Sequence, residues 1–256
     1  MVKTRTAMAL ALLLWSVCLS PVFCGGLSAG EPAKDGEPYR VRHIEREPDL
    51  GDFDSLLWKK AEPTRWYLAG TDGPASCGTD ARLLWSDRYL FVRWKARDRD
   101  IFAYHTERDA RTYEDDAVEL FFKTDPGGDA YYNFEINALG TVYDSFQPRP
   151  VFAGGDHRWS RWDCRGLRTE VLIKGTLNDP SDEDEYWILQ CAIPFEALEG
   201  KTPPRPGDVW RFLPARYDYS VYLPDKGKEL SAAGLLTGSV VSFHDPQYWN
   251  DMIFIE

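Results

Sequence analysis

The sequence predicts an all-β fold, an antiparallel β-sandwich of jelly-roll or immunoglobulin-like type, with one short N-terminal helix. Apolar and polar residues alternate in many short segments that are separated by Gly, Pro and Asp turn signals. Aromatic residues, which favour strands, make up 14% of the chain. No internal repeat or coiled-coil seam occurs. The length of 256 residues suits one large β domain, which we assign to residues 50–256.

The N-terminus predicts a cleaved signal peptide over residues 1–29. Lys3 and Arg5 precede an apolar run at residues 7–19, and small residues follow. The run is too short for a membrane-spanning helix. We therefore expect a secreted or periplasmic protein without membrane attachment after cleavage. A polar lead segment without regular structure is expected over residues 30–49.

Elements are expected in the following order within residues 50–256. A short helix is expected over Phe53 to Pro63, with Asp54 or Ser55 as its cap and the proline as its end. Strand patterns follow, and two of them, at residues 116–123 and 130–137, flank the turn sequence "TDPGGD". The predicted strand segments are residues 81–98 (a hairpin), 116–123, 130–137, 141–146, 169–177, 185–195, 208–219 and 252–256.

The hairpin over residues 116–137 has one apolar face and one polar face. Its polar face carries Glu119 on the first strand and Asn133, Glu135 and Asn137 on the second. A turn near Gly127 places the two glutamates close together, which is unfavourable unless a cation or hydrogen-bond donors intervene. The residues leave open whether the donor is an arginine (Arg93, Arg211 or Arg216) or the hydroxyl groups of a sugar. The face is thus either an ordinary solvated sheet or a ligand-binding surface.

Aromatic residues in the predicted loops favour the ligand-binding interpretation. Tyr113 directly precedes the first strand of this hairpin, and Phe243 lies near the C-terminus. Flat rings stack on sugar rings, and by analogy with aromatic pairs each contact contributes about 0.5–1.5 kcal/mol. The loop tryptophans, Trp159, Trp162 and Trp249, are expected to cap the ends of the core instead.

A series of motifs in order along the chain carries a family resemblance. The motifs are "RLLWSDRYLFVRWKARDRDI", "YEDDAVELFF", "YYNFEINALGTVYD", "IKGTLN", "YWILQCAIPFEAL", "PPRPGDVWRFLPARYD" and "SFHDPQYW". Together they resemble the family 9 carbohydrate-binding modules and their DOMON-like relatives, from about Leu50 to the C-terminus. The resemblance implies a β-sandwich that binds a poly- or oligosaccharide in carbohydrate catabolism. Many relatives are joined to larger secreted enzymes, and the sequence leaves open whether this protein has a partner enzyme.

The resemblance also implies which residues bind the sugar. Two aromatic side chains would sandwich a terminal sugar, and these fall on Tyr113 and Phe243. The polar residues that would bind its hydroxyl groups fall on Glu119, Glu135 and Asn137. Glu135 stands where the family pattern has an arginine, which is a departure.

Other functions are weighed against this one. The net charge of −11 argues against nucleic acid and anionic membranes as partners. A glycoside hydrolase using the Glu119/Glu135 pair is one alternative, and a surface that docks another secreted protein is another. Haem is disfavoured, because Met252 is the only methionine outside the signal peptide.

Calcium and a disulfide are the remaining expectations. The motifs "DRD" (Asp98 to Asp100) and "EDD" (Glu114 to Asp116) are rich in oxygen ligands, so a structural calcium ion that clamps two loops is possible. In an oxidising compartment one bridge could form among three cysteines, with the pairing left open: Cys77, Cys164 and Cys191.

Overall fold

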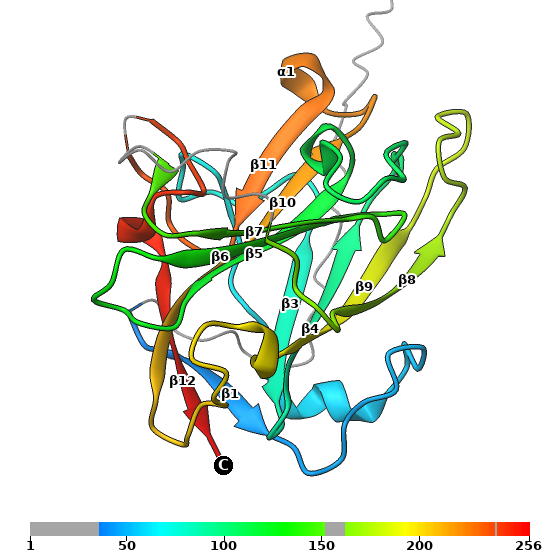
Figure 1. Cartoon of the computed structure of the whole chain (residues 1–256). Helices are drawn as coiled ribbons and strands as arrows, with labels where there is room; N and C mark the ends of the chain where they lie inside the picture. Colours follow the sequence, from blue (N-terminus) through cyan, green and yellow to red (C-terminus); the bar gives the residue numbers. More distant parts are fainter. Residues whose placement is uncertain (1–35, 152–161, 239) are drawn as a thin grey trace, which may run out of the picture.

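The computed structural model describes residues 36–151, 162–238 and 240–256, and its architecture is all-β (Figure 1). The predicted signal peptide and Trp159 lie outside the described residues. The strands are β1 (Tyr39–His43), β2 (Tyr67–Leu68), β3 (Thr79–Trp85), β4 (Tyr89–Arg97), β5 (Ala117–Lys123), β6 (Tyr131–Asn137), β7 (Val142–Gln147), β8 (Arg168–Lys174), β9 (Tyr186–Pro194), β10 (Val209–Tyr219), β11 (Lys228–Ala232) and β12 (Asn250–Ile255).

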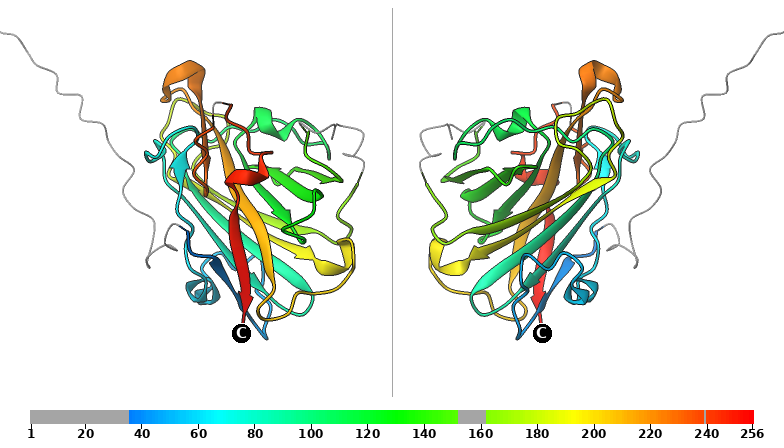
Figure 2. Two further views of the ribbon diagram at one scale, coloured as in Figure 1. Left: turned by 90° about the vertical axis from the view of Figure 1, so that its left-hand side faces the viewer. Right: turned by 90° about the vertical axis from the view of Figure 1, so that its right-hand side faces the viewer.

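The strands form one strongly curled sheet (Figure 2). Its order is β7-β6-β5-β10-β12-β1-β3-β4-β9-β8, and β11 and β2 continue from β10. Side chains of β5 and β6, such as Leu120 and Phe134, share one buried cluster with side chains of β4 and β9, such as Trp94 and Leu189. The two halves of the sheet therefore face each other across a common core, as the alternating pattern predicts.

Helices are short. The segment predicted as a helix over residues 53–63 forms no α-helix: Leu56–Lys60 is a 3-10 helix (η1), with the Ser55 hydroxyl accepting from the Leu57 N–H. Five residues between a cap and Pro63 are too few for a stable α-helix. The other short helices are η2 (Thr112–Glu114), η5 (Phe195–Ala197), η6 (Pro246–Tyr248) and α1 (Pro224–Gly227). Among the described residues, no helix has the length and apolar character needed to cross a membrane.

β1 corrects the prediction that residues 30–49 lack regular structure. Residues 39–43 pair in parallel with β12 on one side and with β3 on the other, so the sheet is mixed rather than wholly antiparallel. Tyr39 and Val41 enter the core while Arg40 and Arg42 point to solvent. Five residues with two arginines form a weak strand signal, and pairing at a distance stabilises it.

The three cysteines within the described residues are all buried. Cys164 and Cys191 carry free thiols, and burial raises the pKa of Cys191 to about 12. Both thiols belong to the same apolar cluster as the strands around them.

Candidate functional site

The predicted register between β5 and β6 is confirmed. Glu119 lies directly opposite Glu135, and Ala117 lies opposite Asn137. The side chains of the two glutamates therefore lie on the same face of the sheet, turned away from the main core. The expectation that this face is open is wrong: Glu119 is 2% exposed and Glu135 is 4% exposed.

A segment after β11 covers this face. Phe121, Tyr131 and Leu213 on the sheet pack against Leu236 and Trp249 from that segment in a second apolar cluster. The backbone N–H of Ala233 donates to the carbonyl of Pro214 in β10, which ties the segment down. The segment after β11 thus buries the apolar residues on this face of the sheet, and it encloses the two glutamates beside them.

The carboxyl groups of the two glutamates interact with each other across the strand pair. Burial and the neighbouring carboxylate raise the pKa of Glu119 well above its usual value, and burial also raises the pKa of Glu135. Glu119 Oε1 accepts from Asn133 Nδ2 (3.4 Å), whereas Oε2 has no donor among the described residues. A proton shared by the two glutamates accounts for the pair, because two ionised carboxylates side by side would repel.

None of the three arginines considered as a partner of this pair contacts it within the described residues. Arg216 pairs with Asp98 and Asp218, and Arg211 binds the carbonyl of Trp249. Arg93 lies in β4, in the other half of the sheet. The shared proton thus takes the place of a cationic partner.

The geometry does not favour the hydrolase alternative. The two carboxylic groups of a glycosidase stand about 5–9 Å apart, with the sugar bond or a water molecule between them. Glu119 and Glu135 touch each other directly and are closed off from solvent, so no substrate can enter between them.

Glu135 positions η2 and with it Tyr113. Its carboxylate accepts hydrogen bonds from the Thr112 hydroxyl and from the backbone N–H of Tyr113. Thr112 is fully buried, while Tyr113 is 38% exposed. Glu135 therefore fixes the one aromatic residue of the predicted pair whose ring reaches solvent.

Asn137 was predicted to contact a sugar, and the structure contradicts this role. Its Nδ2 donates to the His105 carbonyl (2.8 Å) and to Asp115 Oδ2 (2.7 Å). Its Oδ1 accepts from the N–H groups of Leu139 (3.1 Å) and Thr141 (2.9 Å). The side chain is fully buried and its amide has no remaining capacity, so it joins three backbone segments instead of facing a ligand.

The predicted aromatic pair does not form a clamp. Phe243 is 4% exposed and packs edge-on to Tyr217, with ring centroids 5.7 Å apart. The Tyr217 ring lies 6.4 Å from that of Tyr113. Tyr217 thus contacts both rings and fills the space that a sugar would take between them. Phe243 is a core residue, which corrects its assignment as a stacking residue.

Lys228 completes the rim around Tyr113. Its ammonium lies 4.8 Å from the centre of the Tyr217 ring and 5.2 Å from that of Tyr219. Neither Lys228 nor Tyr217 is among the binding residues predicted from the sequence. Alternation in "RYDY" could have indicated that Tyr217 shares a face with Tyr219.

Comparison with known proteins bears on this arrangement. Residues 47–149 match the family model described as carbohydrate-binding family 9. This range includes β5, β6 and η2, and hence the glutamate pair and Tyr113. The resemblance to family 9 modules is confirmed.

Solved structures with the same fold include family 9 modules. One is a candidate carbohydrate-binding protein from Bacteroides uniformis, with a TM-score of 0.62 and 18% identity, covering 84% of this chain and 97% of that one. Two are family 9 modules from Caldicellulosiruptor kristjanssonii. The module in complex with cellotriose has a TM-score of 0.55 and 13% identity, and covers 84% and 93% of the two chains. The module in complex with glucose has a TM-score of 0.54 and 14% identity, and covers 84% and 95%. None of the curated protein sequences matches the chain.

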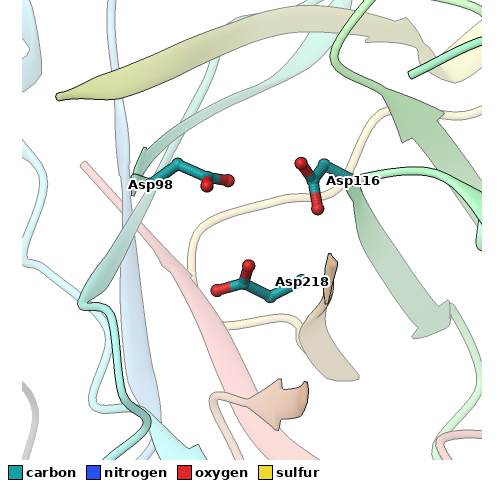
Figure 3. A group of neighbouring side chains, drawn as sticks. All are labelled: Asp98, Asp116 and Asp218. Carbon is teal, nitrogen blue, oxygen red and sulfur yellow. The ribbon is translucent and has the colours of Figure 1, made fainter. Parts of the chain in front are cut away.

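The structure brings some of the predicted calcium ligands together next to the hairpin of β5 and β6. Asp98 and Asp116 meet Asp218, and one carboxylate oxygen of each lies within 4.8 Å of the others (Figure 3). All three are buried. The other acidic residues of the two motifs are not part of this group: Asp100, Glu114 and Asp115.

A guanidinium group already lies in this aspartate cluster. Arg216 Nη2 is 2.8 Å from Asp98 Oδ2 and 3.1 Å from Asp218 Oδ2. Asp116 instead accepts from the backbone N–H groups of Phe102 and Tyr219, both at 2.6 Å. Burial raises the pKa of Asp218 to about 7 although Arg216 lowers it. Protonation and one arginine thus offset most of the negative charge.

Proposed function

We propose that this protein binds carbohydrate without cleaving it, and that the sugar stacks on Tyr113 at the rim of the covered sheet face. The family 9 match over residues 47–149 carries the proposal. Similar folds bind cellotriose and glucose in the two Caldicellulosiruptor kristjanssonii modules, which suggests a neutral sugar here as well.

The chemistry of the rim supports this proposal. Tyr113 offers an exposed ring whose backbone is fixed by Glu135. Lys228 offers ammonium hydrogens beside it, and burial raises the pKa of the Tyr217 hydroxyl, which therefore stays a neutral donor. A flat ring next to hydrogen-bond donors matches the apolar face and the hydroxyl edge of a pyranose.

Binding to a glycan array, followed by titration calorimetry on the sugars retained, tests the proposal. We expect Tyr113→Ala to weaken binding roughly two- to tenfold, because one stacking contact is worth about 0.5–1.5 kcal/mol. The melting temperature should hardly change, since the ring is partly exposed. Tyr186→Ala is the matched control, because Tyr186 is half-buried and lies in β9, in the other half of the sheet.

Three outcomes would contradict the proposal. A wild-type protein that binds no glycan on the array is one. Equal loss of binding in Tyr113→Ala and Tyr186→Ala is another, because it would indicate a general structural effect. Release of reducing ends from bound glycans would show a hydrolase instead.

We also propose that the protein is exported and serves carbohydrate catabolism. The basis is the signal-like sequence over residues 1–29. N-terminal sequencing of the protein from its native host should find a first residue between Phe23 and Gly30. A mature chain that keeps Lys3 and Arg5 would contradict export by cleavage.

A further inference from the structure

Aromatic rings continue beyond Tyr113 through Tyr219 to the loop that carries Phe102 and Tyr104. The strand of Tyr219, β10, runs towards the end of the molecule at which α1 lies (Figure 1). We call five residues the aromatic row: Tyr217, Tyr113, Tyr219, Phe102 and Tyr104. The Tyr219 hydroxyl donates to the Tyr113 carbonyl (2.7 Å). The Tyr219 ring lies 6.3 Å from Phe102, and the Phe102 ring lies 4.9 Å from Tyr104. Successive contacts therefore connect the ring of Tyr104, through Phe102 and Tyr219, to the backbone of Tyr113.

The far end of the row is its most exposed part. Tyr104 is 62% exposed, compared with 38% for Tyr113, while Phe102, Tyr217 and Tyr219 are half-buried. A large ring held in solvent at this exposure contributes little to the core, so packing does not account for its position.

The loop that carries Tyr104 is nevertheless held firmly. Four consecutive backbone N–H groups donate to buried or half-buried side chains: Phe102 to Asp116, Ala103 to Asn178, and both Tyr104 and His105 to Asp115. Asn178 also donates back to the Ala103 carbonyl (2.8 Å). A loop fixed in this way presents its exposed ring without the entropy cost of ordering it on binding.

Asp115 connects the two exposed rings of the row. It accepts from the N–H of Tyr104 (3.2 Å), and it lies two residues after Tyr113. Asn137 holds the same carboxylate (2.7 Å). The buried polar residues below the rim thus set the positions of Tyr104 and Tyr113 together.

We propose that the aromatic row binds a neutral oligosaccharide of three or more units, with one unit on Tyr113 and a more distant unit on Tyr104. This inference rests on the proposed carbohydrate binding and adds to it a second stacking position at Tyr104. Lys228, beside the middle of the row, donates to hydroxyl groups of the units between. Carboxylates below the row, Asp115 and the Glu135 side of the glutamate pair, disfavour chains of sugar acids.

Titration calorimetry of the full-length protein with sugar series of increasing length tests this. The probes are glucose, xylose and mannose, each with its β-1,4-linked oligosaccharides of two to six units. We expect affinity to rise from one unit to three or more. Tyr104→Ala should lower affinity for the long chains roughly two- to tenfold and leave the single sugar unaffected. Tyr113→Ala should lower affinity for every length.

Tyr222→Ala is the matched control for Tyr104→Ala. Tyr222 is 43% exposed at the same end of the molecule, and its ring stacks with the Arg99 guanidinium (4.0 Å) outside the row. It should bind all lengths like the wild type. Tyr104→Phe should also bind normally, since it keeps the ring, and this separates stacking from a folding defect.

The outcomes distinguish this inference from the proposed function. Equal affinity for one unit and six units overturns the extended site alone, and so does a Tyr104→Ala variant that matches the wild type on long chains. In both cases loss of binding in Tyr113→Ala would leave the single-sugar site standing. Failure of the wild type to bind any of the three series overturns both.

Discussion

The proton shared by Glu119 and Glu135 has a consequence for stability that one substitution can measure. Because the pKa of Glu119 is raised in the folded state, folding takes up a proton at pH values between the unfolded and the folded pKa. The stabilising contribution of a raised pKa is fully present below the unfolded pKa, here 4.5, and is lost as the pH rises through the folded pKa. Glu119→Gln removes this dependence, because an amide needs no proton.

The expected magnitude follows from the contacts. The side-chain amide that Glu119→Gln introduces can accept from Asn133 and donate to Glu135, as the protonated carboxyl does. Replacing the protonated Glu119 carboxyl by an amide as the donor to the ionised Glu135 carboxylate lowers the free energy of unfolding by about 1 kcal/mol. Against this, the variant gains about 1.4 kcal/mol for each pH unit between 4.5 and the folded pKa. It should thus be the less stable protein near pH 4.5 and become the more stable one within about one pH unit above it.

Urea denaturation followed by tryptophan fluorescence, at several pH values from 4.5 to neutral, measures this change of sign. Glu135→Gln is the informative contrast. It places an NH₂ group against the Thr112 hydroxyl or the Tyr113 N–H and should destabilise at every pH. Glu170→Gln, at an exposed position in β8, should change little. If Glu119→Gln lowers the free energy of unfolding equally at all pH values, Glu119 is ionised in the fold and the shared proton is wrong.

Two further predictions concern other buried polar groups. Asn137→Ala removes four hydrogen bonds and should lower the free energy of unfolding by about 3 kcal/mol. It should also weaken the binding of long sugar chains, because Asn137 supports the loop of Tyr104. Urea denaturation measures the first effect and calorimetry the second, and an unchanged stability would refute the role given to Asn137. Arg216→Met should cost about 3–5 kcal/mol at neutral pH, because Asp98 and Asp218 then lack their counter-charge. Without the guanidinium the aspartate cluster can hold a cation, so calcium should raise the melting temperature of Arg216→Met but not that of the wild type. If EDTA lowers the melting temperature of the wild type, an ion is already bound beside Arg216, and this prediction is wrong.

The main strands and their faces were predictable from the sequence. Strict alternation in β5 and β6 determines which residues enter the core, and the short turn between them places Glu119 opposite Glu135. These are local relations, because a period of two and a tight turn involve only neighbouring residues. The same reasoning correctly placed two polar residues side by side and correctly required a donor between them.

The cover over this face was not predictable in the same way. Leu236, Phe243 and Trp249 lie in a stretch without a strand pattern, and they pack against β5 and β10. In the sequence they lie more than a hundred residues after Phe121, which they cover. Nothing local in such a stretch indicates whether its rings point to solvent or to a distant sheet. Phe243 was therefore read as a stacking residue, whereas it belongs to the core.

The misassigned polar residues show why buried polar groups and binding loops go together in this fold. Glu135 and Asn137 do not face a ligand, but each bonds a segment that carries an exposed tyrosine, through η2 and through Asp115. Two exposed rings on loops could not keep fixed positions relative to each other without such support, since loop backbones otherwise sample many conformations. Burying the polar groups costs free energy that their full hydrogen bonding offsets. The residues that resemble a binding site by type thus act one layer below it, and variants at Glu135 and Asn137 should alter binding by displacing Tyr113 and Tyr104 rather than by removing a contact to the sugar.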